Sequence, residues 1–127
     1  MIRIGFAIEV VSDEALARYR EAHRAVPPEI SGPGGALDAI GLRAMSIHLL
    51  PPRTLFMQVE AEEGFDPQRD FTRALAMHPV VQRWDDLMHG ELLRRIEGND
   101  TALNWYRLDP IFNWSRPAGS GAREAAE

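Results

Sequence analysis

The stretch "LRAMSIHLLPPRTLFMQVEAE", residues 42–62, decides the fold of this 127-residue chain. It contains two strand-like runs, 42–50 and 54–62, separated by "PPR". The second run alternates apolar with polar side chains, as a strand with one buried face does. Because proline favours turns and interrupts a strand, the two runs are predicted to pair as a β-hairpin.

On the N-terminal side of the hairpin, the pattern predicts a strand and then a helix. Residues 2–10 alternate apolar with small or charged side chains, which is typical of a strand. Ser12 is a preferred helix N-cap, and a helix is predicted from there to about Arg24. Tyr19 and His23 lie four residues apart and therefore share the apolar face of this helix.

The segment after this helix is predicted to be a loop. Pro27 and Pro28 cannot continue the helix, and "SGPGG", residues 31–35, has the composition of a turn. The chain is expected to cross loosely toward the hairpin here. This loop is a candidate rim for a binding site.

On the C-terminal side of the hairpin, Asp66 followed by Pro67 is typical of a helix start. The composition stays helical to about Arg95, with an interruption at the step from His78 to Pro79. A helix in two pieces is therefore predicted between the hairpin and the C-terminal part of the chain.

Residues 104–114, "NWYRLDPIFNW", are aromatic and extended in character and predict a fourth strand, at an edge or with a bulge because of its proline. The predicted order is β-α-β-β-α-β, the split arrangement of a ferredoxin-like α+β fold with both helices on one face of an antiparallel sheet. We expect one domain over residues 1–114. The tail, 115–127, has no apolar periodicity and is predicted to be disordered.

Such a sheet leaves its second face without a cover within one chain. Pairing two of these sheets face to face would close a dimeric α/β barrel with one pocket in each subunit. We therefore expect a homodimer.

Composition limits the classes of partner. The chain has 14 Lys and Arg against 19 Asp and Glu, a net charge of -5, and its basic residues are scattered, so nucleic-acid binding is not expected. No apolar run is long enough to span a membrane. The absence of cysteine suits a reducing compartment, and we expect a cytoplasmic protein.

The sequence lacks the motifs of several enzyme classes. None of the four histidines pairs with another histidine or a carboxylate at a recognised metal-ligand spacing, so no metal is expected. There is no GxSxG, no glycine-rich phosphate loop and no dinucleotide fingerprint, so no cofactor is expected.

What remains is a set of polar and aromatic side chains predicted to point toward one face of the sheet. They are Tyr19 and His23 from the first helix, His48 from the hairpin, and Trp84 with Asp85 and Asp86 from the second helix. A tyrosine and a histidine on an apolar stripe are more often core residues with satisfied hydrogen bonds than catalysts. From composition and spacing alone, the function stays open.

Several motifs of the sequence are similar to those of the L-rhamnose mutarotases, small sugar-anomer isomerases with a dimeric ferredoxin-like fold. "YREAHRAVPPEI" resembles the family segment Tyr-x3-His-x3-Trp-Pro-Glu-Leu, and "VVQRWDDLM" resembles Val-x-Gln-Arg-Trp-Trp-x-x-Met. The strand pair "SIHLLPPRTLFMQVEAE" and the ending "LDPIFNW" extend the resemblance over nearly all of residues 2–114.

The resemblance implies that His23 is the proton donor and that Tyr19 and Trp84 contact the sugar. Exchange of anomers needs a proton given to the ring oxygen and one taken from the anomeric hydroxyl, which an imidazole can do near neutral pH without a cofactor. A tryptophan face also suits the apolar C–H patch of a pyranose. The expected substrate is a monosaccharide such as the 6-deoxy sugars L-rhamnose or L-fucose.

The chain departs from the family pattern at three places. Pro27 stands where the family has a tryptophan, Asp85 replaces the second tryptophan of a pair, and a substrate-binding tyrosine of the family falls near Ala44 or Met45. A carboxylate in place of an aromatic ring changes a pocket from stacking to hydrogen bonding, which should change the sugar accepted. The substrate-binding residues predicted in this way are Tyr19, Met45, His48, Trp84 and Asp85.

Two other functions are compatible with these residues. The same scaffold could carry out another cofactor-free proton transfer, such as isomerisation or lactone chemistry, with His23 and Asp85 as acid and base. Alternatively, the pocket could bind a sugar or small acid, or serve dimerisation, without catalysis.

Overall fold

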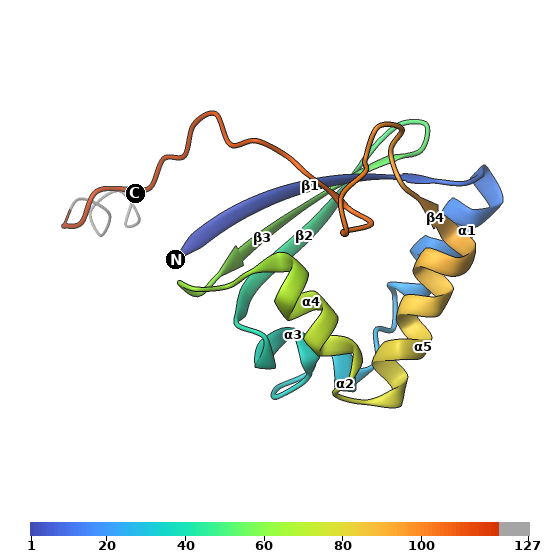
Figure 1. The fold of residues 1–127 in the computed structure, drawn as a ribbon, viewed down its shortest axis with the longest axis horizontal. Helices are drawn as coiled ribbons and strands as arrows, with labels where there is room; N and C mark the ends of the chain where they lie inside the picture. Colours follow the sequence, from blue (N-terminus) through green and yellow to red (C-terminus); the bar gives the residue numbers. More distant parts are fainter. Residues whose placement is uncertain (120–127) are drawn as a thin grey trace, which may run out of the picture.

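The sheet of this protein is curled and carries its helices on one side. The computed structural model describes residues 1–119 (Figure 1). Strand β1 spans Ile2–Val10, and the hairpin consists of β2, Leu42–Leu50, and β3, Thr54–Ala61. The strand order is β2-β3-β1-β4, where β4 is Leu93–Arg94, and all pairs are antiparallel. The predicted α+β, ferredoxin-like architecture and its central hairpin are confirmed.

The register of the sheet separates two sets of side chains. Ile4 lies opposite Val59, and Ile8 lies opposite Leu55, so these apolar residues share the face that the helices cover. Opposite pairs point to the same side of a sheet and alternate along each strand. The other face carries the intervening residues, including the cross-strand pair of Ala7 and Phe56.

The helices begin at the caps that the sequence predicts. Helix α1, Asp13–Ala22, begins after Ser12, whose hydroxyl accepts a hydrogen bond from the backbone N–H of Ala15 at 3.0 Å. Helix α4, Pro67–Leu75, begins after Asp66, whose carboxylate accepts one from the N–H of Arg69. Helix α5, Pro79–Leu87, follows the predicted break at His78. These side chains satisfy N–H groups that the first turn leaves unpaired.

The predictions for the loop after α1 and for the end of the second helical region need correction. The predicted loop contains two one-turn helices, α2, Pro28–Ser31, and α3, Ala36–Ala39. The second helical region ends earlier than predicted, in a π-helical turn η1, Met88–Leu92, followed by the short strand β4, Leu93–Arg94. The buried residues Leu92 and Leu93 are drawn into the core and the sheet, which overrides their helical propensity.

The fourth strand is much shorter than the predicted span of 104–114. Only β5, Tyr106–Arg107, pairs with β1, opposite Ala7 and Phe6, while β4 occupies the end of the same edge. Leu108 adds one hydrogen bond from its N–H to the carbonyl of Gly5, and no strand is assigned over residues 108–119. Without a neighbouring strand to pair with, an extended aromatic sequence gains no ladder hydrogen bonds.

Most of the tail predicted to be disordered, residues 120–127, lies outside the described residues.

The core lies between the sheet and the helices in two adjoining clusters. One is centred on Phe6 and Val59, and the other on Ile8 and Val10. These four side chains are fully buried. None of the helices in residues 1–119 is long and apolar enough to cross a membrane.

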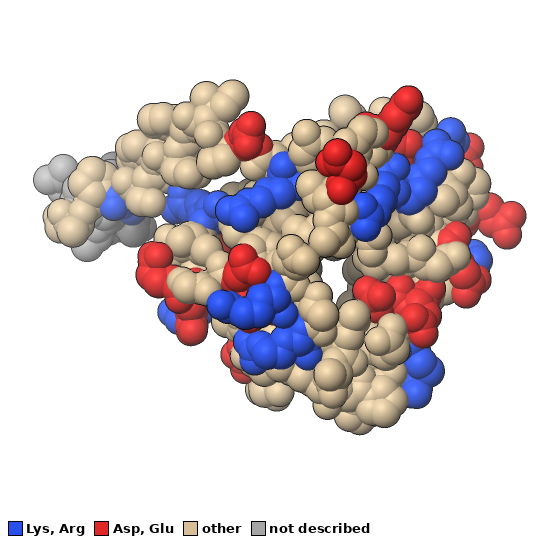
Figure 2. Space-filling view, in the orientation of Figure 1, with Lys and Arg blue, Asp and Glu red and all other residues tan. Residues whose placement is uncertain are grey.

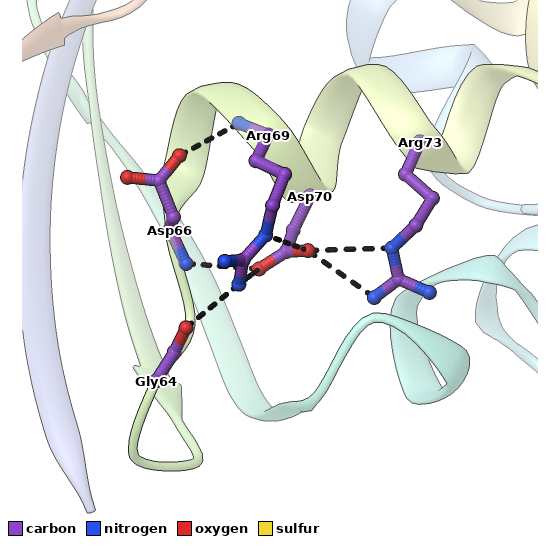
Figure 3. A network of polar contacts seen from close by, with 5 residues as sticks. All are labelled: Gly64, Asp66, Arg69, Asp70 and Arg73. Carbon is purple, nitrogen blue, oxygen red and sulfur yellow. Dashed lines mark hydrogen bonds and ion pairs between the residues drawn. The ribbon is translucent and has the colours of Figure 1, made fainter.

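A buried carboxylate ties the turn after β3 to the start of α4 (Figure 3). Asp70 is 2% exposed and accepts a hydrogen bond from the backbone N–H of Asp66 at 2.8 Å. Arg69 and Arg73 donate to its two oxygens at 2.9–3.3 Å, and Arg69 also donates to the carbonyl of Gly64. Hydrogen bonds, first from Arg69 and then from the Asp66 backbone and Arg73, hold the pKa of Asp70 well below its usual range.

Candidate functional site

A cavity of about 930 Å³ lies between the sheet and the helices. This volume is within the range of roughly 300–1,000 Å³ typical of small-molecule sites. Its floor is the helix-facing side of the sheet, including Met57 and Ile47, and its walls come from α1, α5 and the segment 102–105. Figure 2 shows the surface hollowed between α4 and α5, with acidic side chains over α5 beside the hollow.

His23 occupies the C-cap of α1 and lines this cavity. Its Nδ1 lies 2.8 Å from the backbone carbonyl oxygen of Tyr19, one turn earlier. A carbonyl can only accept, so Nδ1 carries the hydrogen and donates it, which leaves Nε2 as the nitrogen that can exchange a proton. The helix end thus fixes both the ring orientation and the tautomer of His23.

Two aromatic rings enclose the imidazole of His23. The ring of Tyr19 stacks on it with centroids 4.2 Å apart and a tilt of 32°. The ring of Trp84, from α5, meets it edge to face at 5.0 Å and 73°. Tyr19 is buried and Trp84 is half-buried, so the three rings form one packed cluster at the cavity wall. The i, i+4 spacing of Tyr19 and His23 predicted that the two side chains share a helix face. The packing of α5 against α1 brings the ring of Trp84 into contact with His23 as well.

The hydroxyl of Tyr19 is set up to donate a hydrogen bond. Burial raises the pKa of Tyr19, so the phenol stays protonated at neutral pH. The described residues contain no fully buried side-chain polar atom that lacks a partner, so this hydroxyl is not sealed in the core. A protonated phenol at a cavity wall can hold a hydroxyl or carbonyl oxygen of a ligand.

Asp85 and His89 form a second polar pair in the same cavity. Oδ1 of Asp85 and Nε2 of His89 are 3.9 Å apart, and both residues line the cavity. Burial raises the pKa of Asp85 and lowers the pKa of His89, while each partner's charge opposes the shift of the other. Sequence reasoning gave His89 no role, although the four-residue spacing from Asp85 on one helix was a signal that could have found it.

The remaining predicted residues lie at different places. Met45 is opposite Val59 in the register and lines the cavity from the floor. His48 is opposite Phe56, so its side chain belongs to the other face of the sheet, where Nε2 lies 3.1 Å from Oγ of Ser46. Because β2 is an edge strand, His48 still borders the rim of the cavity.

The segment between β4 and β5 closes one wall, which the sequence did not predict. Arg95 donates to Oδ1 of Asn104 at 3.2 Å and to the carbonyl of Thr101, and Asn99 donates to the carbonyls of Leu103 and Asn104. The segment 102–105 therefore lies against the cavity as an ordered wall.

Residues 1–119 contain no group of three or more His, Cys, Asp or Glu side chains placed to hold a metal ion.

A comparison of the sequence with models of known protein families shows the family to which the chain belongs. A model of the L-rhamnose mutarotase family matches residues 3–114. The chain belongs to this family. Membership of the L-rhamnose mutarotase family supports a mutarotase-like function of the isomerase type.

Two individual proteins are also similar. A UPF0734 protein of Dictyostelium discoideum is 32% identical over 110 residues, which cover 84% of this chain and 85% of that protein. The tetracenomycin F2 cyclase of Streptomyces glaucescens, a type-II polyketide cyclase, aligns with a TM-score of 0.59 over 92% of this chain and all of that chain. At 15% identity, the cyclase shows a common fold alone.

Two of the positions at which this member of the L-rhamnose mutarotase family departs from the family pattern line the cavity. Asp85 and Met45 face it directly, whereas Pro27 caps α2 beside the cavity-lining residues Val26 and Ile30. The predicted loop rim is thus part of the wall. The cavity combines an aromatic cluster around His23 with an acidic position on α5.

Proposed function

We propose that the chain is a mutarotase that interconverts the α and β anomers of a monosaccharide, a 6-deoxy sugar such as L-rhamnose or L-fucose. The observation that carries this proposal is the placement of His23, whose Nδ1 donates to the Tyr19 carbonyl while the ring lines the cavity of about 930 Å³. Family membership supports the same reaction class.

In the proposed mechanism, protonated His23 donates from Nε2 to the ring oxygen of the sugar. The C1–O5 bond breaks, the anomeric hydroxyl gives its proton to a base in the cavity or to water, and the open-chain aldehyde rotates about C1–C2 before the ring closes on either face. The packed rings of Tyr19 and Trp84 fix the imidazole, so its proton transfer needs little reorganisation. The equilibrium between anomers is unchanged, and only its rate rises.

The proposed sugar contacts are the cavity-lining side chains around His23. Trp84 offers an apolar face to the C–H groups of the ring, and the Tyr19 hydroxyl and Asp85 carboxylate offer partners for hydroxyl groups. Met45 supplies an apolar contact from the floor. The role of His48, on the other face of β2, stays a prediction.

The test is saturation-transfer proton NMR between the anomeric signals of L-rhamnose, L-fucose and other aldoses. Wild-type protein is expected to accelerate exchange for at least one sugar, and His23→Ala is expected to lose that acceleration. Glu21→Ala is the matched control, because Glu21 lies on the same helix, is exposed and forms a surface ion pair with Arg24. Exchange as fast in His23→Ala as in the control would refute the role of His23.

We also propose that the protein works as a homodimer in the cytoplasm, for which the absence of cysteine is suitable. The sheet face away from the helices carries exposed apolar side chains, with Phe56 at 36% and Leu108 at 38%, and residues Ile111, Phe112 and Trp114 beyond β5 are exposed as well. Large exposed apolar side chains near one face are typical of an interaction surface.

The oligomeric state is measured by sedimentation equilibrium. Wild-type protein is expected at twice the chain mass, and Phe56→Glu is expected to shift it toward the monomer because a charge would be buried between the two sheets. Glu63→Gln serves as a surface control in the turn after β3. A monomeric wild-type protein would refute the dimer.

A further inference from the structure

Resting on the proposed function, we propose that Asp85 and His89 form the second proton-transfer group of the cavity. In this assignment, His89 takes the proton of the anomeric hydroxyl and returns it, and Asp85 holds the charge that His89 gains. His23 serves the ring oxygen alone.

Because Nδ1 of His23 is used in a hydrogen bond, the reaction needs a second proton-transfer group. Opening the ring requires a proton at O5 and the removal of a proton from O1, two different oxygens on the same carbon. His23 has one nitrogen available, because its Nδ1 donates to the Tyr19 carbonyl at 2.8 Å. A single nitrogen cannot donate to one oxygen while accepting from another, so the cavity must supply another base or leave the step to water.

The placement of His89 meets this need. His89 lies in η1, the π-helical turn that continues α5, and lines the cavity into which His23 also faces. Its partner Asp85 directly follows Trp84, the residue whose ring contacts His23. Single π-helical turns are rare and often occur at functional sites. The wider turn keeps His89 at the cavity while Glu91 points outward.

The turn has contacts on two sides. Glu91 forms a surface ion pair with Arg18 of α1 at 3.1 Å, and α1 carries Tyr19 and ends at its C-cap, His23. Met88 and Leu92 are buried in the core cluster below it. The two proton-transfer groups therefore stand on neighbouring elements that are packed together, as a positioned acid and base require.

The electrostatics favour a neutral His89 beside the carboxyl group of Asp85. Burial lowers the pKa of His89, the charge of Asp85 opposes this, and Arg95 adds to the lowering. At neutral pH the imidazole can accept a proton, and the imidazolium that forms lies 3.9 Å from the carboxylate. The other titratable or charged groups near the pair are Asp86 on α5, and Tyr19, Arg20, His23 and Arg24 on α1.

The protons balance over one turnover. Protonated His23 gives its Nε2 proton to O5 as the C1–O5 bond breaks, and neutral His89 takes the proton of O1 as the C1=O1 bond forms. After rotation about C1–C2, the O5 hydroxyl attacks C1 and returns its proton to His23, while O1 recovers a proton from His89. No oxidant, reductant or metal takes part. A carboxylate has two oxygens, so Asp85 can contact both His89 and a sugar hydroxyl.

The experiment compares His89→Gln and Asp85→Asn with Asp86→Asn in the anomer-exchange assay. Asp86 is the matched control, because it is the adjacent acid on α5, is exposed and is held outside the cavity by Gln82. His89→Gln is expected to lower kcat about 100-fold, a typical loss for a general base, with KM changed much less. Circular dichroism and thermal melting establish that each variant is folded.

The pH profile separates a proton-transfer role from a structural one. In the wild type, kcat/KM is expected to fall at low pH as His89 becomes protonated, with a midpoint below the usual histidine value of about 6.5. His89→Gln should lose this acidic limb. Asp85→Asn should move it to lower pH, because removing the carboxylate charge lowers the pKa of His89 further. NMR titration of the histidine rings measures the same displacement without sugar.

The outcomes distinguish this inference from the proposed function. If wild-type protein exchanges anomers and His23→Ala does not, but His89→Gln behaves as Asp86→Asn does, the pair is not a proton-transfer group and the inference is wrong. An acidic limb that persists unchanged in His89→Gln would also overturn it. If no sugar is exchanged by the wild type, the proposed function and this inference fail together.

Discussion

Replacement of the buried carboxylate Asp70 should reveal how the start of α4 is held. In Asp70→Asn, one amide oxygen can still accept from the N–H of Asp66, but the amide NH2 then faces guanidinium donors instead of a carboxylate oxygen. Both arginines are at least half exposed and can be rehydrated, so their contacts count as surface ion pairs of up to about 1 kcal/mol each. The expected loss of unfolding free energy is about 1–2 kcal/mol.

The alanine variant should cost more. Asp70→Ala also leaves the partly buried N–H of Asp66 without its partner at 2.8 Å, which adds roughly 1–2 kcal/mol, so the total is about 2–4 kcal/mol. For a chain of this length, each kcal/mol corresponds to a decrease of roughly 3–6 °C in Tm. Urea unfolding followed by circular dichroism and tryptophan fluorescence measures both variants, with Asp100→Asn as an exposed control.

The stability difference between wild type and Asp70→Asn should depend on pH with a definite sign. The folded state lowers the pKa of Asp70, so the unfolded state binds a proton first as the pH falls. The contribution is fully present above about pH 5 and is lost as the pH falls through the unfolded value of about 3.9 toward the lower folded value. A difference that stays constant from pH 6 to pH 2.5, or an alanine variant as stable as wild type, would refute the reasoning.

The remaining predictions concern the caps, the core, one turn and the cavity. Ser12→Ala should lose about 1 kcal/mol of unfolding free energy because it removes an N-cap, and an unchanged urea midpoint would contradict this. Ile8→Ala should lose about 2–5 kcal/mol from the core, whereas Leu50→Ala, 54% exposed, should lose far less; equal losses would argue against the core assignment. Gly41→Ala should lose about 1–2 kcal/mol, since φ there is 94° while the added Cβ meets only ordinary contacts; a neutral effect in thermal melts would count against strain. Trp84→Ala should raise the KM for the sugar as well as lower kcat, as measured by anomer exchange at several sugar concentrations; an unchanged KM would exclude a sugar contact.

Short-range signals predicted much of the fold and the shared helix face of Tyr19 and His23. The i, i+4 relation of Tyr19 and His23 follows from helix geometry, and the structure stacks their rings 4.2 Å apart. Alternation along β3 placed Met57 and Val59 on the helix-facing side. The register of β2, by contrast, could not be read from its composition, so Met45 and His48 were assigned together although they belong to opposite faces.

The extents of the last elements depended on distant partners. Leu93 becomes a strand residue because it pairs with Val10, more than eighty residues earlier, whereas no strand is assigned over residues 108–119, where Leu108 adds a single backbone hydrogen bond to Gly5. The position of His89 is of the same kind, since it lies in a π-helical turn whose residues Met88 and Leu92 are buried in the core. Hydrogen-bond partners and packing, not local propensity, set these features.

The sequence by itself determined the order of the elements, the caps of α1 and α4, the break before α5, and the shared face of Tyr19 and His23, because hydrophobic periodicity and capping act over a few residues. Only the tertiary structure decided that Trp84 closes on His23 and that Asp85 and His89 share its cavity. It also decided that Arg95 holds the wall at Asn104. These contacts join residues from separate elements, and their geometry exists only once the helices have packed on the sheet.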